Sequence, residues 1–244
     1  MQCGRRLFQK PYSMNFDLYG FGPALLAGTW MTIQLALTSL VVGLILGLLG
    51  ALAKTSPFRV LRWLGDAYST LVRGVPELLW VLLIFYGTVG AVRALGEMIG
   101  QPDLELSPFA AGVLALGLCF GSYATEVFRG ALLSIPRGQR EAGLALGLSR
   151  KRIFTQLVLP QMWRVALPGL GNLFMILMKD TALVSVIGLN EVMRQAQIAV
   201  TASKQPFTFF MVAAVIYLTL TVFSMLALHW FEKRANRGFG RSRA

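Results

Sequence analysis

The chain has 244 residues, of which 55% are hydrophobic and only 14% are charged. Soluble domains carry about 25% charged residues, so this composition indicates an integral membrane protein. The net charge of +12 does not indicate a nucleic-acid-binding protein, because the basic residues lie in short segments between apolar runs, as the positive-inside rule requires. The two cysteines, Cys3 and Cys119, cannot form a disulfide framework, and no metal-ligand spacing surrounds them.

The N-terminal tail, residues 1–13, is basic and lacks a long apolar stretch directly after its charges, so we expect no cleaved signal peptide. Met14 would be a cleaner start of translation, because it removes the basic residues from a terminus that the topology below places outside. From Leu18 to Ala53, 36 residues carry no charge, more than the roughly 20 needed to cross a bilayer. We therefore place the first membrane span at residues 24–53.

The second span is expected at residues 76–92, after a segment, 54–75, in which basic residues outnumber a single acidic one. This charge bias places segment 54–75 in the cytoplasm, so the first span runs from outside to inside. Pro76 and Glu77 open the second span with residues that favour the first turn of a helix. We interpret Glu77 as a helix-start residue, and a role in substrate binding is the alternative.

The third span, expected at residues 107–128, opens with Ser107-Pro108, a favourable N-cap and first-turn pair. The preceding segment, 93–107, is acidic and is therefore expected to be an external loop. Its Asp103 and Glu105 are expected to be solvated. The alternative is that they form a vestibule whose negative charge attracts a substrate.

Residues 126–164 contain seven lysines and arginines against two glutamates and are the most basic stretch of the chain, so we place them in the cytoplasm. Within them, the stretch from Glu141 to Pro160 reads EAGLALGLSRKRIFTQLVLP. Helix-forming residues before Gly147 predict a short helix that ends at this glycine in a left-handed conformation. Ser149 is a good N-cap for a second helix, which Pro160 should break or kink.

The first of these two helices has one small and mostly apolar face, formed by Glu141, Leu144, Ala145 and Leu148. A helix-bend-helix with such a face is suited to insertion into the groove of a partner protein. The alternative, which amphipathicity alone favours, is an ordinary helix in a cytoplasmic loop.

The apolar run 165–178 carries the clearest sequence signal for a translocation path. It is interrupted at Pro168-Gly169 and at Gly171-Asn172, and the charged pair Lys179-Asp180 follows it. A broken helix with charges at membrane depth is tolerated only where it faces protein or a water-filled cavity.

The last span is expected at residues 207–230, and a basic C-terminal tail, 239–244, closes the chain. The interrupted helix that begins with the apolar run 165–178 is the fourth span. Five spans then place the N-terminus in the periplasm and the C-terminus in the cytoplasm.

Two other classes of membrane protein fit the sequence less well. An intramembrane enzyme needs a nucleophile with a base, or a metal cluster, at membrane depth. The only histidine, however, is His229 at the end of the last span, and no H-E-x-x-H or G-x-S-x-G pattern occurs. A stand-alone secondary transporter would carry coupling carboxylates inside its spans and internal repeats, and no such repeat is visible.

Four stretches carry a resemblance: LVRGVPEL (71–78), YATEVFRGA (123–131), the loop at 141–160, and LPGLGN (167–172) with KDTALVSVIGL (179–189). Together they resemble the polar amino-acid permease subunits of bacterial ABC importers, above all the permeases for histidine, lysine, arginine and ornithine and the related opine permeases. The loop resembles the EAA signature, with which such permeases dock on an ATPase. Gly143 is a departure, because the family commonly has Ala there. The resemblance covers about residues 14–238.

The resemblance implies an all-α integral membrane protein of the type I ABC importer class. Domain 14–238 would hold about five transmembrane helices, with a cytoplasmic coupling helix in loop 137–160. The residues expected to couple transport to the ATPase are Glu141, Ala142, Gly143, Leu144, Ala145, Gly147, Leu148 and Pro160.

The implied partners are a second permease subunit, identical or different, two cytoplasmic ATPase subunits, a periplasmic substrate-binding protein and the lipid of the bacterial inner membrane, but not nucleic acid. No G-x-x-x-x-G-K-[ST] pattern occurs in the chain. ATP and magnesium are therefore expected on the ATPase, and this chain is expected to be a transport subunit without a cofactor or catalytic residues.

The resemblance also implies the cargo, which is a cationic amino acid such as arginine, lysine, histidine or ornithine, or an opine, imported by alternating access. A permease for another polar or neutral amino acid is the alternative. A cation needs a carboxylate on its path to offset lost hydration. Glu77 and Glu126 are expected near the cytoplasmic ends of their spans, so Glu191 is the main candidate, with a helix-start role after Asn190 as the alternative. The expected pathway residues are Glu191, Asp180, Ser122 and Tyr123.

Overall fold

The computed structural model describes residues 18–98, 100 and 106–235 of the chain. Within these residues the protein is helical and contains no β-strand, which confirms the all-α prediction. The predictions for the tails, 1–13 and 239–244, for a start at Met14, and for Asp103 and Glu105 fall outside the described residues.

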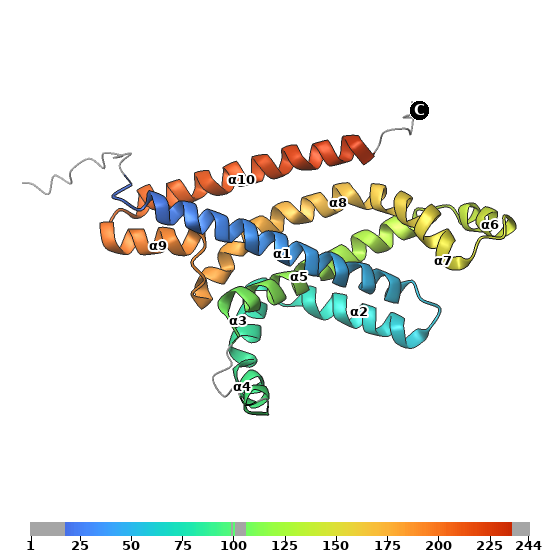
Figure 1. Ribbon diagram of the computed structural model, residues 1–244, viewed down its shortest axis with the longest axis horizontal. Coiled ribbons are helices and arrows are strands. Elements are labelled where there is room, and N and C mark those ends of the chain that lie inside the picture. The colour runs from blue at the N-terminus through green and yellow to red at the C-terminus, as the bar shows by residue number, and fades with distance from the viewer. Residues whose placement is uncertain (1–17, 99, 101–105, 236–244) are drawn as a thin grey trace, which may run out of the picture.

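The helical elements follow one another along the chain and are labelled in Figure 1. They are α1 (Gly22–Lys54), α2 (Arg59–Gly74), α3 (Glu77–Gly87), α4 (Val89–Met98), α5 (Pro108–Leu133), α6 (Arg137–Ala145), α7 (Arg150–Arg152), the π-helical segment η1 (Ile153–Val158), α8 (Leu159–Asp180), the 3-10 segment η2 (Thr181–Ile187), α9 (Val192–Ser203) and α10 (Pro206–Ala235).

Helices α1 and α5 form the centre of the bundle and pack along each other (Figure 1). Glycines on α1 permit this close approach. A β-carbon at Gly43 would lie 2.5 Å from the ring of Phe120, and one at Gly47 would lie 2.6 Å from the β-carbon of Ala124. In a membrane, where lipid tails are as apolar as the side chains, helices associate through small residues that let their backbones come together.

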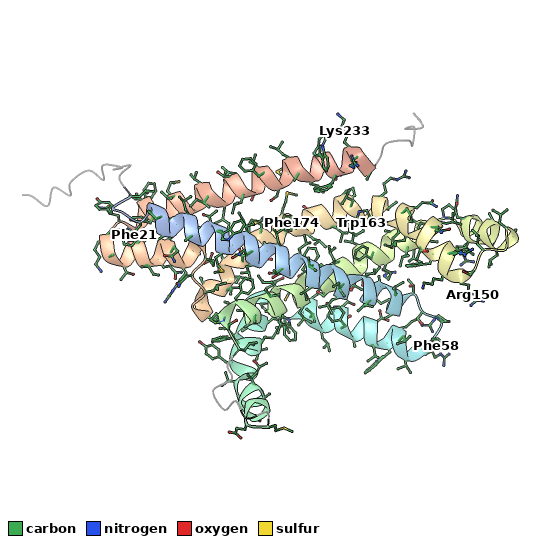
Figure 2. All side chains as sticks on the ribbon, in the orientation of Figure 1. Phe21, Phe58, Arg150, Trp163, Phe174 and Lys233 are labelled. Carbon is green, nitrogen blue, oxygen red and sulfur yellow. The ribbon has the colours of Figure 1, made fainter. Side chains whose placement is uncertain are left out.

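The segments that charge counting assigns to the cytoplasm gather toward one end of the molecule. Figure 1 shows α6, α7 and the C-terminal ends of α1 and α10 toward this end, and α9 with the start of α1 toward the other. In Figure 2, Phe58, Arg150 and Lys233 lie toward the first end and Phe21 toward the second.

Four helical segments in the described residues are long and apolar enough to cross a membrane, and a fifth arises if α2 and α3, which meet at 103°, form one bent span. Counted in this way, the expected number of about five spans is confirmed. The first, third and last spans correspond to α1, α5 and α10, and the largest differences from the expected bounds lie at the C-terminal ends of α5 and α10. Residues 93–98, expected in an external loop, instead belong to α4.

Segment 54–75, predicted as a cytoplasmic connection, is not an extended loop. Most of it forms α2, which folds back along α1 and packs against α5 (Figure 1). The hydroxyl of Tyr68 donates a hydrogen bond of 2.9 Å to the backbone oxygen of Leu118, in the middle of α5. Of the four basic residues in this segment, Lys54 and Arg73 pair with Glu126 of α5, whereas Arg59 and Arg62 are exposed.

The predicted break or kink at Pro160 takes the form of a change in helix type, because η1 ends at Val158 and Pro160 lies in the first turn of α8. The π-helical segment η1 directly precedes it, and its wider turn relieves the clash between a proline ring and the preceding helical turn. Helix α8 likewise continues through Pro168.

The glycines of α8 serve close packing instead of a helix break. A β-carbon at Gly169 would lie 2.9 Å from Val127 of α5, and one at Gly171 would overlap the side chain of Leu228 of α10. The interruption comes later, where α8 ends at Asp180 and the chain continues as η2.

Candidate functional site

A cavity of about 190 Å³ lies among α3, α5 and the C-terminal end of α8. Two lining residues, Glu77 and Asp180, carry carboxylates, and none of the described residues that line the cavity is basic. Apolar side chains, among them Phe120 and Leu177, form most of the remaining wall. The cavity borders the middle of α5, and it is open to the surface of this chain, because Ile176 in its lining is 42% exposed.

Glu77 reaches this cavity because the chain turns sharply just before it. Val75 is extended, Pro76 follows, and Glu77 begins α3. The hydroxyl of Tyr123, another lining residue, donates a hydrogen bond of 3.1 Å to Oε1 of Glu77. The expectation that Glu77 lies near the cytoplasmic end of its span is therefore corrected. It does begin a helix as expected, but its side chain also lines the cavity.

The corner between α2 and α3 is closed by a further contact. The indole nitrogen of Trp80 donates a hydrogen bond of 3.0 Å to the backbone oxygen of Val72, which spans the bend. The sequence signal for this corner was the Gly74-Val75-Pro76 run, because proline disfavours a helical conformation in the residue before it.

Asp180 lies at the point where α8 gives way to η2, and its half-buried carboxylate lines the cavity. Lys179, its neighbour in sequence, lines a different hollow of about 410 Å³, together with Met193 and Tyr217. The lysine therefore does not share the cavity with Asp180, although the two residues are adjacent in sequence.

The other two expected pathway residues do not line the cavity. Ser122 is fully buried and donates its hydroxyl to the backbone oxygen of Cys119 at 2.7 Å. Glu191 is also fully buried, and it is the N-cap of α9. Its carboxylate oxygens accept the backbone N–H groups of Met193 and Arg194, each at 2.8 Å. This is the geometry of the helix-start alternative.

The loop expected to couple to an ATPase projects from one end of the bundle as α6 and α7 (Figure 1). Helix α6 ends as the sequence predicts. Gly147 has φ +74°, and the N–H of Leu148 donates to the backbone oxygen of Gly143 at 3.0 Å. The hydroxyl of Ser149 then accepts the N–H of Arg152 at 3.4 Å and caps the next helix.

Of the expected face of α6, Glu141, Leu144 and Ala145 are exposed, and only Leu148 is not. Leu144 is 55% exposed and Leu146 is 80% exposed, so two large apolar side chains are accessible at the surface. Gly143 is buried, and a β-carbon there would lie 2.8 Å from Ile153. Leu148 is half-buried and packs against the core. Of the remaining expected coupling residues, Glu141, Ala142, Ala145, Gly147 and Pro160 are all exposed.

A cluster of charges joins α1, α2 and α5 between the cavity and the C-terminal end of α5. Glu126 lies at its centre. Its Oε1 accepts a hydrogen bond from Lys54 and lies 3.5 Å from Nη2 of Arg73, while its Oε2 accepts from Arg129 at 2.8 Å. Lys54 also pairs with Asp66 at 3.0 Å. Sequence reasoning assigned this cluster no role, because its members lie on three helices and form no local pattern.

A helical membrane bundle with an internal carboxylate cavity and a helical loop projecting at one end defines a subunit of a membrane transport system. The family described as "Binding-protein-dependent transport system inner membrane component" matches residues 39–237, and the chain belongs to this family. It is therefore a transport component and not an enzyme, as expected.

Relatives with transport names match nearly the whole chain. The histidine/lysine/arginine/ornithine transport system permease protein HisQ of Escherichia coli K12 is 41% identical, over 92% of this chain and 99% of HisQ. The arginine ABC transporter permease protein ArtQ of the same strain is 44% identical, over 85% and 92%. The octopine transport system permease protein OccQ of Rhizobium meliloti is 39% identical, over 93% and 97%.

Solved structures confirm the fold. A chain from the crystal structure of an amino acid ABC transporter with histidines superposes with a TM-score of 0.75 at 30% identity, over 89% of this chain and 96% of that one. A chain of the inward-facing MetNI methionine ABC transporter in its native crystal form gives a TM-score of 0.66 at 17% identity, a likeness of fold alone. The expected type I importer permease fold is thereby confirmed.

Proposed function

We propose that this chain is one permease subunit of an ABC importer that carries a cationic amino acid or an opine from the periplasm to the cytoplasm. The observation that carries the cargo proposal is the cavity in which Glu77 and Asp180 lie without a basic residue in the described lining. A cation that leaves water loses hydration, and a nearby carboxylate offsets this loss. The apolar wall strengthens the attraction, because charges interact more strongly where water is excluded.

The number of carboxylates favours a cationic over a neutral amino acid. Every amino acid carries one α-ammonium group, which one carboxylate can receive. The second carboxylate, at Glu77 or Asp180, is then free to receive a charged side chain such as a guanidinium or an ammonium group. The names of the relatives agree with this class, since HisQ and ArtQ are named for basic amino acids and OccQ for octopine.

The projecting loop supports a partnership with an ATPase. Helix α6 presents Leu144, and its C-cap presents Leu146, at the surface near Glu141, and these side chains form the proposed contact with the ATPase. Closure of two ATPase subunits would move α6 and rock the attached spans between outward-open and inward-open states. A second permease subunit and a periplasmic binding protein complete the complex, and ATP and magnesium bind to the ATPases.

The orientation follows from the distribution of charge over the two ends. Arg137, Arg140, the 150–152 run and Lys233 belong to segments that lie toward the same end as α6 (Figures 1 and 2). Basic residues beside membrane spans favour the cytoplasmic side, so this end is assigned to the cytoplasm and α9 to the periplasmic side.

The experiment that tests the cargo proposal replaces Glu77 with Gln, which keeps the size of the side chain and removes its charge. The complex with its partner permease, ATPases and binding protein is reconstituted in proteoliposomes, and ATP-dependent uptake of labelled arginine is measured. We expect Glu77→Gln to reduce arginine uptake by about tenfold or more, because a desolvated cation loses one of two counter-charges. Uptake of a neutral analogue, citrulline, should change far less.

Glu97→Gln is the matched control, because it makes the same chemical change at an exposed position of α4, away from the cavity. It should leave arginine uptake unchanged. If the wild-type complex transports citrulline at the same rate as arginine, the result would favour the second candidate, a permease for neutral amino acids. Unchanged arginine uptake by Glu77→Gln would remove the cavity from the cargo path.

A further inference from the structure

The corner between α2 and α3 is braced by side chains on both sides. Before the corner, the guanidinium of Arg73 lies 3.5 Å from Oε1 of Glu126. After the corner, Glu77 accepts the hydroxyl of Tyr123 at 3.1 Å. The hydrogen bond of Trp80 described above links the two arms directly. The position of Glu77 in the cavity therefore depends on contacts made before and after the bend.

Both braces come from one face of α5. Tyr123 and Glu126 are three residues apart, and side chains at this spacing project from the same side of a helix. At the corner itself, Val75 is extended with φ −114° and ψ 135° and Pro76 has no N–H to donate, so no backbone hydrogen bond between the described residues joins α2 to α3 across the bend. Helix α5 is thus the support against which the corner is set.

We propose that Glu126 is a positioning residue for the cargo cavity. It holds Arg73, fixes the corner between α2 and α3, and so places the carboxylate of Glu77 where cargo binds. Glu126 does not line the cavity and acts through Arg73, not by touching cargo. The inference rests on the proposed function in one respect, the assignment of this cavity to cargo.

The charges around Glu126 explain how its loss would reach the corner. Lys54, Arg73 and Arg129 converge on its carboxylate, and without that charge these three cations repel one another. The side chain of Lys54 is only 10% exposed and is also held by Asp66. The side chain of Arg73 is 34% exposed, and its other hydrogen bond, from Nε to the backbone oxygen of Ser69 at 2.9 Å, lies within α2 and does not hold the corner to α5. Arg73 would therefore yield first, and the brace before the corner would be lost.

The test measures binding of labelled arginine to the purified complex in detergent, for Glu126→Gln, Arg73→Gln and the double variant. Each single change should raise the Kd for arginine by about tenfold, a coupling of the size found for residues that act through a network. The double variant should raise the Kd no further than either single variant does, because both single changes break the same brace. Basal ATPase activity should stay within about twofold of wild type.

Asp66→Asn is the matched control. It also removes a carboxylate that pairs with Lys54, but the structure shows Asp66 in no ion pair with Arg73. The Kd for arginine should therefore stay unchanged. Glu126→Asp keeps the charge and should recover most of the affinity. If Glu126→Gln does not assemble, Arg73→Gln carries the test, because it leaves no unpaired cation at the corner.

Additive losses in the double variant, or an equal loss in Asp66→Asn, would overturn the proposal, because both outcomes indicate general destabilisation. Glu77→Gln separates this inference from the proposed function. If Glu77→Gln binds arginine normally, the cargo cavity itself is wrongly assigned. If Glu77→Gln binds arginine weakly while Glu126→Gln and Arg73→Gln bind it normally, only the positioning role fails.

Discussion

The hydroxyl of Tyr217 donates a hydrogen bond of 2.8 Å to Oε2 of Glu191 and so joins α10 to the start of α9. Two backbone N–H groups of α9 occupy the same carboxylate, and the neighbouring N–H of Val192 donates to Thr32 of α1 at 3.3 Å. Glu191, which is fully buried, and Val192 together therefore join the start of α9 to α10 and α1. These contacts support a structural role and leave the carboxylate no lining position in the cargo cavity.

We predict that Glu191→Ala destabilises the protein without weakening cargo binding. The loss of the cap should cost about 1 kcal/mol, and the unpaired hydroxyl of Tyr217 should add about 1–3 kcal/mol. Thermal unfolding of the purified complex in detergent measures this as a lower midpoint temperature. Glu97→Ala, at an exposed position, is the control and should leave the midpoint unchanged. A normal midpoint together with weakened arginine binding would restore Glu191 as a cargo residue.

A second prediction concerns the packing of α1 on α5. Gly47→Leu should prevent the close approach of the two helices, because even a β-carbon at this position would lie 2.6 Å from Ala124. We expect little or no protein to accumulate in the membrane, measured by immunoblotting. Gly90→Leu in α4, where a β-carbon meets nothing within 4 Å, should accumulate normally. Normal accumulation of Gly47→Leu would show that α1 is not held in this position.

Local signals in the sequence predicted those elements whose formation depends on neighbouring residues. Ser107 caps α5 by accepting the N–H of Ala110 at 3.2 Å, and Gly147 ends α6 in the expected left-handed conformation. Apolar length predicted α1 and α10. These features were predictable because capping, backbone conformation and membrane thickness each act within one segment.

The parts that the sequence did not predict depend on pairing between distant segments. Charge counting treated Lys54 as solvated, but it is half-buried and pairs with Glu126, 72 residues away. Lys54 also contacts Asp66 at 3.0 Å and Ser69 at 2.8 Å, and these contacts hold α2, which leads to Glu77, against α1. Pro168 did not break α8, because glycines on this helix let it pack tightly against α5 and α10. Such pairings cannot be read from a single segment.

Membrane orientation gives a third prediction. A reporter enzyme that is active only in the periplasm should be silent when fused after Ala235, at the end of α10, because this end carries the basic segments. The same reporter inserted at Gly100, beyond α4, should be active. Reporter protein levels, measured by immunoblotting, are the control for both fusions. The reverse pattern of activity would place α6 in the periplasm and would exclude its contact with a cytoplasmic ATPase.

The last prediction concerns the backbone of the projecting loop. Gly147 and Gly138 both face open space, where a β-carbon meets nothing within 4 Å, but Gly147 has φ +74° and Gly138 lies within α6. Gly147→Ala should cost about 1–2 kcal/mol in the left-handed conformation, whereas Gly138→Ala should be neutral or slightly stabilising in a helix. The bulkier Gly147→Leu should insert into the membrane normally yet lose transport.

The strain in Gly147→Leu would reorient α6 against α7, so the docking surface at Leu144 and Leu146 would no longer fit the ATPase. We expect the amount of ATPase that co-purifies with the permease to fall by about tenfold, while arginine binding to the permease is retained. Gly138→Ala should retain both the ATPase and transport. The two alanine variants carry the same new side chain at positions that differ mainly in backbone conformation. If both retain the same amount of ATPase, the turn at Gly147 does not set the docking geometry. Normal transport by Gly147→Leu would remove the loop from the coupling mechanism.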